Sequence, residues 1–432
     1  MNFLRKGWCR AYQLVFRLAL PFLPYRTPQL LHRVQDVPGA LKQEGISRVL
    51  LVTDARIRGA GLTASLEQAL SESGILCTVY DDTVANPTVD NVEAARQRYL
   101  QQQCQGLIAF GGGSSIDCAK AVGARLAQPK KTLGEMNGIL KIHRRLPVLV
   151  AIPTTAGTGS ETTLAAVITD PATHHKYPIN DFPLIPRYAV LDPEVTRSLP
   201  PFVTATTGMD ALTHAIEAYI GGSTTCETRA AATKAVQLIF TYLKRAVENG
   251  SDMEAREQML QAAFLAGSAF SKSYVGYVHA VAHSLGGRYN IPHGLANSVL
   301  LPIVLEAYGP SAEKKLHQLS CAAGLSTPEE SDAIGAAALI RAIRRMNREM
   351  GIPTQLEGIH AEDIPQLARY ADREANPLYP VPRLWDHTEL EYFYYAVMEG
   401  APQNERVGDP SDRGKSTCLL SSRAHPAGSS AH

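Results

Sequence analysis

The chain has 432 residues, of which 45% are hydrophobic and 19% are charged, and its formal net charge is +1. This composition is typical of a globular protein long enough for two domains with a substantial core. A near-neutral charge does not support nucleic-acid binding, which normally requires a basic face or arm. The seven cysteines are scattered without a CxxC pair, so we expect free thiols in a reducing cytoplasm, and neither disulfides nor a zinc ribbon.

Residues 1–30 form an apolar and basic extension, with no acidic residue before Asp36. Arg17 interrupts the apolar run, and the run is shorter than the roughly 18 apolar residues of a membrane span. We expect an amphipathic helix that packs on this protein or on a partner subunit. The alternative is a helix that lies on a membrane surface or targets the chain. We expect the protein to be cytoplasmic.

Residues 31–200 alternate short β-branched runs with helical stretches. Helical patterns cover 61–74 and 91–103. Buried-strand patterns occupy 47–54, 76–82, 106–110, 146–155 and 188–194. Strands and helices in alternation predict βαβ units and therefore an α/β domain with a parallel sheet.

After about residue 200 the strand patterns end. Long runs with apolar residues at helical spacing follow, and Gly250 stands where one of them stops. We expect an all-helical domain over 201–401. Residues 402–432 lose apolar periodicity and predict a disordered tail.

Two stretches that follow predicted strands are typical of phosphate binding. The first, “GGGSS” at 111–115, lies between a strand and a helix, where glycine lets backbone N–H groups approach an anion. The second is “IPTTAGTGSETT” at 152–163. Its short hydroxyl side chains include Thr154, Thr155, Thr158 and Ser160. The alternatives are a tight turn without a ligand and a loop whose hydroxyls satisfy its own backbone.

Asp54 closes the first of these predicted strands. A carboxylate at such a strand end can accept hydrogen bonds from a ribose 2′-OH and repels a 2′-phosphate, which favours NAD over NADP. The alternative is a helix N-cap, and both roles can hold.

Histidines and one aspartate, at helical spacing, predict a metal site. Asp210 and His214 leave one face of a predicted helix. His279 and His283 repeat that spacing, and His293 lies on a constrained turn between a proline and a glycine. One carboxylate with two or three imidazoles suits a divalent cation such as Fe²⁺ or Zn²⁺. The spacing leaves open whether His283 is a ligand.

Several long motifs, in one order, resemble those of the iron-containing (group III) alcohol dehydrogenases. They are “GGGSSIDCAKA”, “IPTTAGTGSE”, “LDPEVTRSLPP”, “TGMDALTHAIEAY”, “VHAVAHSLGGRYNIPHGLANSVLLP” and “NPLYPVPRLWDHTEL”. The resemblance implies an α/β dinucleotide-binding domain over 31–200 and an all-helical metal-binding domain over 201–401. It also implies an active site in the cleft between them and a homo-oligomer, a dimer or larger.

The same resemblance assigns roles to particular residues. It implies that Asp210, His214, His279 and His293 hold the metal, which the family makes Fe²⁺, with Zn²⁺ as the alternative. It places His283 beside the nicotinamide, where our hypothesis is a proton relay to solvent. The positions that match cofactor contacts are Asp54, Gly112, Gly113, Ser114, Asp117, Thr154, Thr155, Thr158, Ser160 and Lys176.

The implied reaction is transfer of a hydride between a small primary alcohol or diol and NAD, because a cation lowers the pKa of a bound hydroxyl. One alternative is a hydroxyacid–oxoacid transhydrogenase on the same fold, and another is a lyase of the sugar-phosphate cyclase type. A third is a scaffold protein that has kept an inherited site. Arg288 could meet a substrate carboxylate, but we expect it to lie on the helix surface or in a structural pair.

Overall fold

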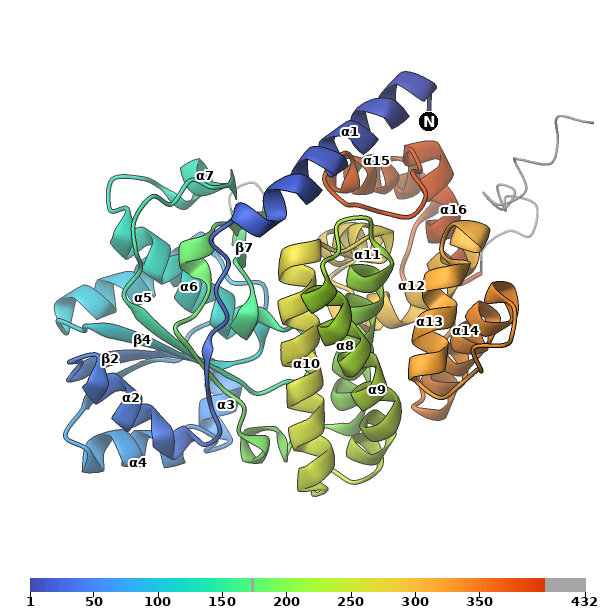
Figure 1. Ribbon diagram of the computed structural model, residues 1–432. Coiled ribbons are helices and arrows are strands. Elements are labelled where there is room, and N and C mark those ends of the chain that lie inside the picture. Colours follow the sequence, from blue (N-terminus) through green and yellow to red (C-terminus); the bar gives the residue numbers. More distant parts are fainter. Residues whose placement is uncertain (172–174, 401–432) are drawn as a thin grey trace, which may run out of the picture.

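The computed structural model describes residues 1–171 and 175–400 (Figure 1). The first part of the described chain is α/β and the second is helical, so the predicted fold class is confirmed. The tail predicted to be disordered, 402–432, lies outside the described residues. The last strand in the described part ends at Val190, and the long helices begin at Pro201.

A six-stranded parallel sheet is the centre of the N-terminal part, with strand order β1-β9-β6-β4-β2-β3. The strands are β1 (Gln29–Leu31), β2 (Arg48–Val52), β3 (Leu76–Tyr80), β4 (Gly106–Gly111), β6 (Val148–Pro153) and β9 (Tyr188–Val190). The central strand β4 is buried along its whole length. Continuous apolar runs of this kind are typical of parallel strands covered on both faces.

Helices cover both faces of this sheet (Figure 1). Side chains alternate along a strand, so Leu51 packs into one hydrophobic cluster and Leu50 into the other. The first cluster includes α2 (Val37–Gln43) and α4 (Ala64–Glu72), and the second includes α5 (Val89–Gln101) and α6 (Gly113–Ala127). Two short helices complete this part, α3 (Ala55–Gly59) and α7 (Leu133–Met136).

A second, three-stranded sheet was not predicted from the sequence. Its order is β5-β8-β7, and it consists of β5 (Gly138–Ile139), β7 (Ala165–Asp170) and β8 (His175–Asn180). β7 and β8 are antiparallel. β8 has the sequence HKYPIN, in which a proline stands among polar residues, so no apolar strand pattern marks it.

Nine α-helices follow in the described part. They are α8 (Pro201–Ile220), α9 (Cys226–Glu248), α10 (Met253–Ser273), α11 (Tyr277–Tyr289), α12 (His293–Tyr308), α13 (Glu313–Ala322), α14 (Asp332–Glu349), α15 (Ile364–Ala375) and α16 (His387–Val397). α8 begins with proline, which suits the first helical position because its missing N–H has no partner there. It packs against α9, α10 and α12, so most of its side chains are buried.

The N-terminal helix α1 (Phe3–Ala19) lies along the outside of the helical part, beside α15 (Figure 1). Arg5 pairs with Asp372, and Gln13 donates to the Tyr379 carbonyl. Packing on this protein, the expected arrangement, is therefore observed. In the described ranges no helix is both long enough and apolar enough to cross a bilayer, and the six cysteines described there are free.

Candidate metal centre and cofactor loop

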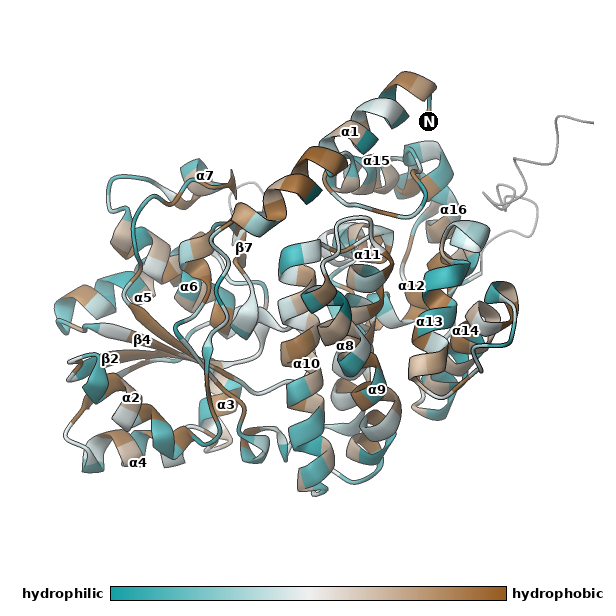
Figure 2. Cartoon of the chain, in the orientation of Figure 1, coloured by the Kyte–Doolittle hydropathy of each residue, from teal (hydrophilic) through white to brown (hydrophobic). Residues whose placement is uncertain are grey.

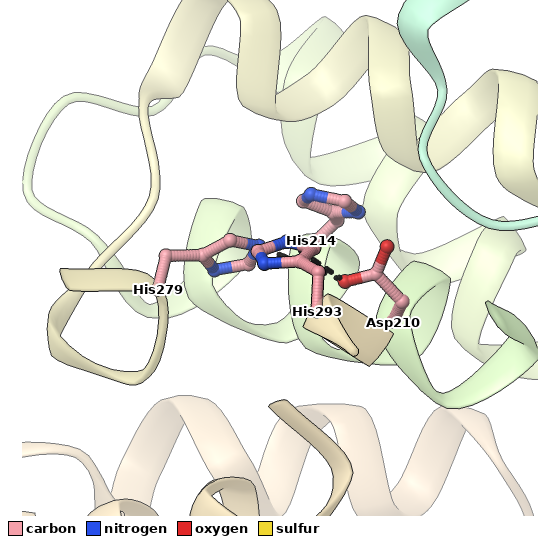
Figure 3. A group of neighbouring side chains, drawn as sticks. All are labelled: Asp210, His214, His279 and His293. Carbon is pink, nitrogen blue, oxygen red and sulfur yellow. Dashed lines mark ion pairs between the residues drawn. The ribbon is translucent and has the colours of Figure 1, made fainter. Parts of the chain in front are cut away.

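Four side chains from three helices converge on one point (Figure 3). Asp210 and His214 come from α8, His279 from α11, and His293 is the first residue of α12. One ligand atom from each lies within 4.8 Å of those of the other three. The structure therefore brings together the four residues for which the sequence analysis expects a metal, with His293 less buried than the rest.

Gly294 explains how His293 reaches this cluster. A Cβ atom at Gly294 would lie 2.5 Å from the backbone oxygen of Thr206 on α8, well inside contact distance. Glycine therefore lets the beginning of α12 approach α8. The approach leaves His293 Nε2 3.4 Å from Asp210 Oδ1. The glycine that follows His293 is thus required for close packing of α12 on α8, and this packing positions the imidazole.

The charge of the cluster fits a cation. Asp210 is 2% exposed, and no lysine or arginine in the described chain pairs with it. Its close donor is the Asn297 amide, at 2.6 Å. His279 Nε2 is buried without a hydrogen-bond partner among the described residues. A buried carboxylate beside an unpaired imidazole nitrogen is costly unless a positive ion completes the group.

The three imidazoles are suited to donate lone pairs. Burial lowers the pKa of His214 and that of His293 below the ordinary value, and lowers the pKa of His279 well below it. The rings are therefore neutral at ordinary pH, which is the form that binds metals.

Glu217 was not identified from the sequence. Its carboxylate lies 2.6 Å from His279 Nδ1 and accepts hydrogen bonds from the backbone N–H groups of Gly276 and Val278. This contact directs the other ring nitrogen, Nε2, toward the cluster. Carboxylates commonly orient metal-binding histidines in this way. The available signal was its place on α8, seven residues after Asp210 and hence on the same helix face.

His283 lies beside the four-residue cluster and is not a member of it. Its ring stacks on that of His293, with 5.1 Å between centroids. His283 Nδ1 is 2.7 Å from Glu374 Oε1, which also accepts a hydrogen bond from the Tyr379 hydroxyl at 2.7 Å. The side chains of His283 and Glu374 are 38% and 34% exposed. The pair therefore connects the edge of the cluster with solvent, and the sequence analysis did not identify Glu374.

The two stretches typical of phosphate binding lie side by side. They follow the carboxyl ends of β4 and β6, where Gly111 pairs with Pro153 and Thr154 N–H donates to the Gly111 carbonyl. Gly112 is the N-cap residue of α6 and has no side chain to accept a hydrogen bond. The backbone N–H groups at the start of this helix are therefore available to an anion. The hydroxyl of Thr155 is buried with no partner in the described part of the chain.

Other predicted cofactor residues are committed to internal hydrogen bonds. Ser160 donates to Asp117 at 2.7 Å, and Asp117 also accepts from the Val167 N–H. Fully buried Lys120, which the sequence analysis missed, donates to Thr163 and to the Ala165 carbonyl at 2.8 Å. These bonds hold together α6, β7 and the loop that follows β6.

The remaining predicted cofactor residues lie close to this loop or at the strand ends. Thr158 accepts from Ser160 N–H, Ser114 accepts from Asn86 N–H at 3.4 Å, and Lys176 donates to the Asn86 side chain. Asp54 caps α3, because its Oδ1 accepts from the N–H groups of Arg56 and Ile57. The capping role considered for Asp54 is therefore observed. Arg288 pairs with Asp363 on the surface, as expected.

Loop 154–163 also contacts the helix that carries Asp210. A Cβ atom at Gly157 would lie 2.6 Å from the backbone oxygen of Thr207, one turn before Asp210 on α8. Gly159 adopts a φ of +60° and lies against Gly267 on α10. The glycine-rich loop and the metal cluster are thus adjacent, at the junction of the α/β and helical parts.

Comparison with known proteins decides the family. Residues 29–193 match the family model described as iron-containing alcohol dehydrogenase, and residues 204–398 match the C-terminal model of the Fe-containing alcohol dehydrogenase family. The chain belongs to the iron-containing alcohol dehydrogenases. The protein is therefore an enzyme of alcohol oxidoreduction. Residues before 29, including α1, lie outside both matches.

Individual iron-containing alcohol dehydrogenases are similar over most of this chain. Alcohol dehydrogenase 4 of Schizosaccharomyces pombe is 39% identical over 83% of this chain and 84% of its own length. An NAD-dependent methanol dehydrogenase of Bacillus methanolicus is 38% identical over 78% of this chain and 89% of its own. The crystal structure of a 1,3-propanediol oxidoreductase superposes with a TM-score of 0.82 at 35% identity, covering 86% of this chain and 98% of that one.

Proposed function

We propose that this protein transfers a hydride between a small primary alcohol or diol and NAD, with Fe²⁺ held by Asp210, His214, His279 and His293. The observation that carries the proposal is the convergence of these four side chains next to the glycine-rich loop. Similarity to a methanol dehydrogenase and a 1,3-propanediol oxidoreductase supports a small substrate.

The protein's own groups prepare the cation site. A divalent cation supplies Lewis acidity, which stabilises negative charge on an alcohol oxygen and polarises a carbonyl. Asp210, His214 and His279 are buried, while the His293 side chain is 36% exposed. A site with three nitrogens and one oxygen binds Zn²⁺ more tightly than Fe²⁺, so iron is favoured by its supply.

His283 is the proposed proton carrier. Its ring is held in place by the stack on His293 and by the 2.7 Å contact with Glu374. Both His283 and Glu374 are partly exposed, so a proton accepted from a substrate hydroxyl can pass from the imidazole toward solvent.

The cofactor is proposed to bind across the carboxyl ends of β4 and β6. Backbone N–H groups at Gly113 and Ser114 would meet the pyrophosphate, because they open α6 without a carbonyl partner. Asp54 Oδ1 is used in capping α3, and its Oδ2 takes no hydrogen bond from the described residues, so it is available to a ribose hydroxyl. This arrangement supports NAD over NADP.

The test combines metal analysis with activity. Purified protein should contain iron and should release free NADH when supplied with NAD and a small alcohol or 1,3-propanediol. His279→Ala should lose the metal and the activity, while the control His32→Ala, an exposed histidine in the α/β part, should keep both. Full activity of His279→Ala would refute the proposal. Hydride transfer between two bound substrates without release of NADH would favour the transhydrogenase.

A further inference from the structure

The N-terminal helix α1 has one face fixed to the protein. Cys9 and Gln13 are buried, at 1% and 6% exposure. Arg5 forms a two-point contact with Asp372, and Gln13 donates to the Pro377 and Tyr379 carbonyls. The helix is therefore docked along the surface of the helical part, and its opposite side faces away.

Figure 2 shows hydrophobic residues along α1, and seven large apolar side chains here are exposed. These side chains, which we call the outer face of α1, are Phe3 (87% exposed), Leu4 (82%), Trp8 (63%), Leu14 (55%), Val15 (68%), Leu18 (65%) and Phe22 (86%), the last just beyond the helix end. They account for 7 of the 17 large hydrophobic residues that are exposed in the described chain. Such clustering marks an interaction surface, whereas single exposed apolar residues are normal.

The charges beside the outer face are all positive. Lys6, Arg10 and Arg17 are exposed and recur at spacings of four and seven, so they follow one flank of the helix. The Arg10 guanidinium donates to the Val381 and Pro382 carbonyls and so helps to dock the helix. No carboxylate in the described residues pairs with Lys6 or Arg17, and the first acidic residue of the chain is Asp36. An apolar stripe with a cationic edge is the pattern of a helix that lies in a membrane interface.

We propose that the outer face of α1 docks this enzyme on an anionic membrane surface, with the apolar side chains among the lipid headgroups and Lys6 and Arg17 against lipid phosphates. A second copy of the chain fits the outer face less well than a membrane does, because α1 has no acidic residue to neutralise the cationic flank of another α1. The matched family segments begin at residue 29. The surface therefore belongs to an extension that the shared catalytic fold does not require.

Trp8 provides a direct readout on the full-length protein. The chain has two tryptophans, and the other, Trp385, is fully buried. We expect Trp8 emission to shift to the blue, and the protein to sediment, with vesicles of phosphatidylglycerol and phosphatidylcholine. Vesicles of phosphatidylcholine alone should bind much less, and added salt should release the protein, because exposed charges are screened.

Two pairs of variants separate the apolar and the cationic contributions. Leu4→Gln/Leu18→Gln should abolish vesicle binding, while Leu76→Gln, which removes a leucine of matched exposure (67%) on β3, should leave it unchanged. Lys6→Ser/Arg17→Ser should weaken binding to anionic vesicles about 25-fold, from roughly fivefold per cation. The matched pair Lys234→Ser/Arg341→Ser, on α9 and α14, should have no effect.

Three results would overturn the proposal. The first is the absence of binding to anionic vesicles, and the second is equal binding to neutral ones. The third is a change of oligomeric state in Leu4→Gln/Leu18→Gln, measured by sedimentation velocity, since this would assign the outer face to a second copy. None of these outcomes depends on the proposed alcohol dehydrogenase reaction.

Discussion

Two buried carboxylates, Glu217 and Glu161, contribute to this enzyme without belonging to the set of four candidate ligands. Glu217 orients His279 through a 2.6 Å contact, and burial raises the pKa of Glu217 to about 8. Glu161 lies in the loop after β6, and burial raises its pKa to about 7. Neither carboxylate was identified from the sequence, because each acts through contacts with its folded surroundings.

Replacement of Glu217 by glutamine should weaken metal binding by about 10- to 100-fold, as is usual for partners of metal-binding histidines. The reason is that the amide no longer fixes the His279 ring with Nε2 toward the cluster. The measurement is a metal titration of demetallated protein against a competing chelator. Glu227→Gln, an exposed glutamate on α9, is the control. Equal affinity of Glu217→Gln and wild type would remove Glu217 from this role.

Glu161 should make stability depend on pH. Its pKa is about 7 in the folded protein and roughly 4.3 in an unfolded chain. Since the folded pKa is the higher one, the stabilising contribution is complete below about pH 4 and is lost as the pH rises through about 7. Glu161→Gln should therefore gain stability relative to wild type between about pH 5 and 7.5, by up to roughly 3 kcal/mol.

Urea unfolding at about pH 5 and at about pH 7.5 measures the difference in stability between Glu161→Gln and wild type. Exposed Glu257 provides the control variant Glu257→Gln, whose stability should follow that of wild type at both values. A difference between Glu161→Gln and wild type that stays constant with pH would show that Glu161 does not hold its proton more tightly on folding.

The turn between β4 and α6 combines two requirements in consecutive glycines. Gly111 adopts a φ of +155°, and a Cβ atom there would lie 2.4 Å from Ser115 Oγ. Gly112 has an ordinary φ of −74°, and the nearest atom to its Cβ would be 3.7 Å away on Thr155. The first glycine is therefore required for the backbone to fold, and the second is available for the cofactor.

Gly111→Ala and Gly112→Ala should consequently differ. Gly111→Ala should lose about 1–3 kcal/mol of stability through backbone strain and overlap with Ser115. Gly112→Ala should keep its stability within about 0.5 kcal/mol, but its methyl group should lower NAD affinity by standing between the backbone and a phosphate. Chemical unfolding and calorimetric titration with NAD separate the two effects. Similar losses of stability in both variants would contradict this division.

The α/β and helical parts meet through backbone contacts that only glycine permits. Gly267, within α10, lies so close to the loop after β6 that a Cβ atom would be 2.3 Å from Thr162 Oγ1 and 2.9 Å from Gly159 Cα. Because α8 carries Asp210 and also contacts this loop, the junction sets the distance between the candidate cofactor site and the candidate metal site. A small displacement of this junction would therefore change the distance between the two candidate sites.

Gly267→Ala should destabilise the protein by about 1–3 kcal/mol, although alanine favours helices, because the added methyl overpacks the junction. Gly287→Ala is the matched control, since Gly287 is also helical but has no atom within 4 Å of an added Cβ. It should stabilise the protein by about 0.5–1 kcal/mol. Thermal unfolding of the two variants measures both values. A gain of stability in Gly267→Ala would show that the junction has free space.

The sequence alone determined the fold class, because alternating strand and helix patterns, followed by helical periodicity alone, are local properties of the chain. It also determined which residues to consider for the metal and the phosphates, since spacing on a helix and glycine after a strand are local signals. The tertiary structure decided what depends on contacts between distant segments. Glu217 meets His279 across 62 residues, and Glu374 meets His283 across 91.

The same distinction explains the N-terminal helix and the second sheet. Amphipathic spacing predicted α1 but left open whether it packs on this protein or faces a membrane, and the fold shows that one face is docked while the other is exposed. The second sheet was missed because β8 has a proline among polar residues and gains its register from β7. Local patterns specify which face of an element is apolar, but only the folded chain decides what that face contacts.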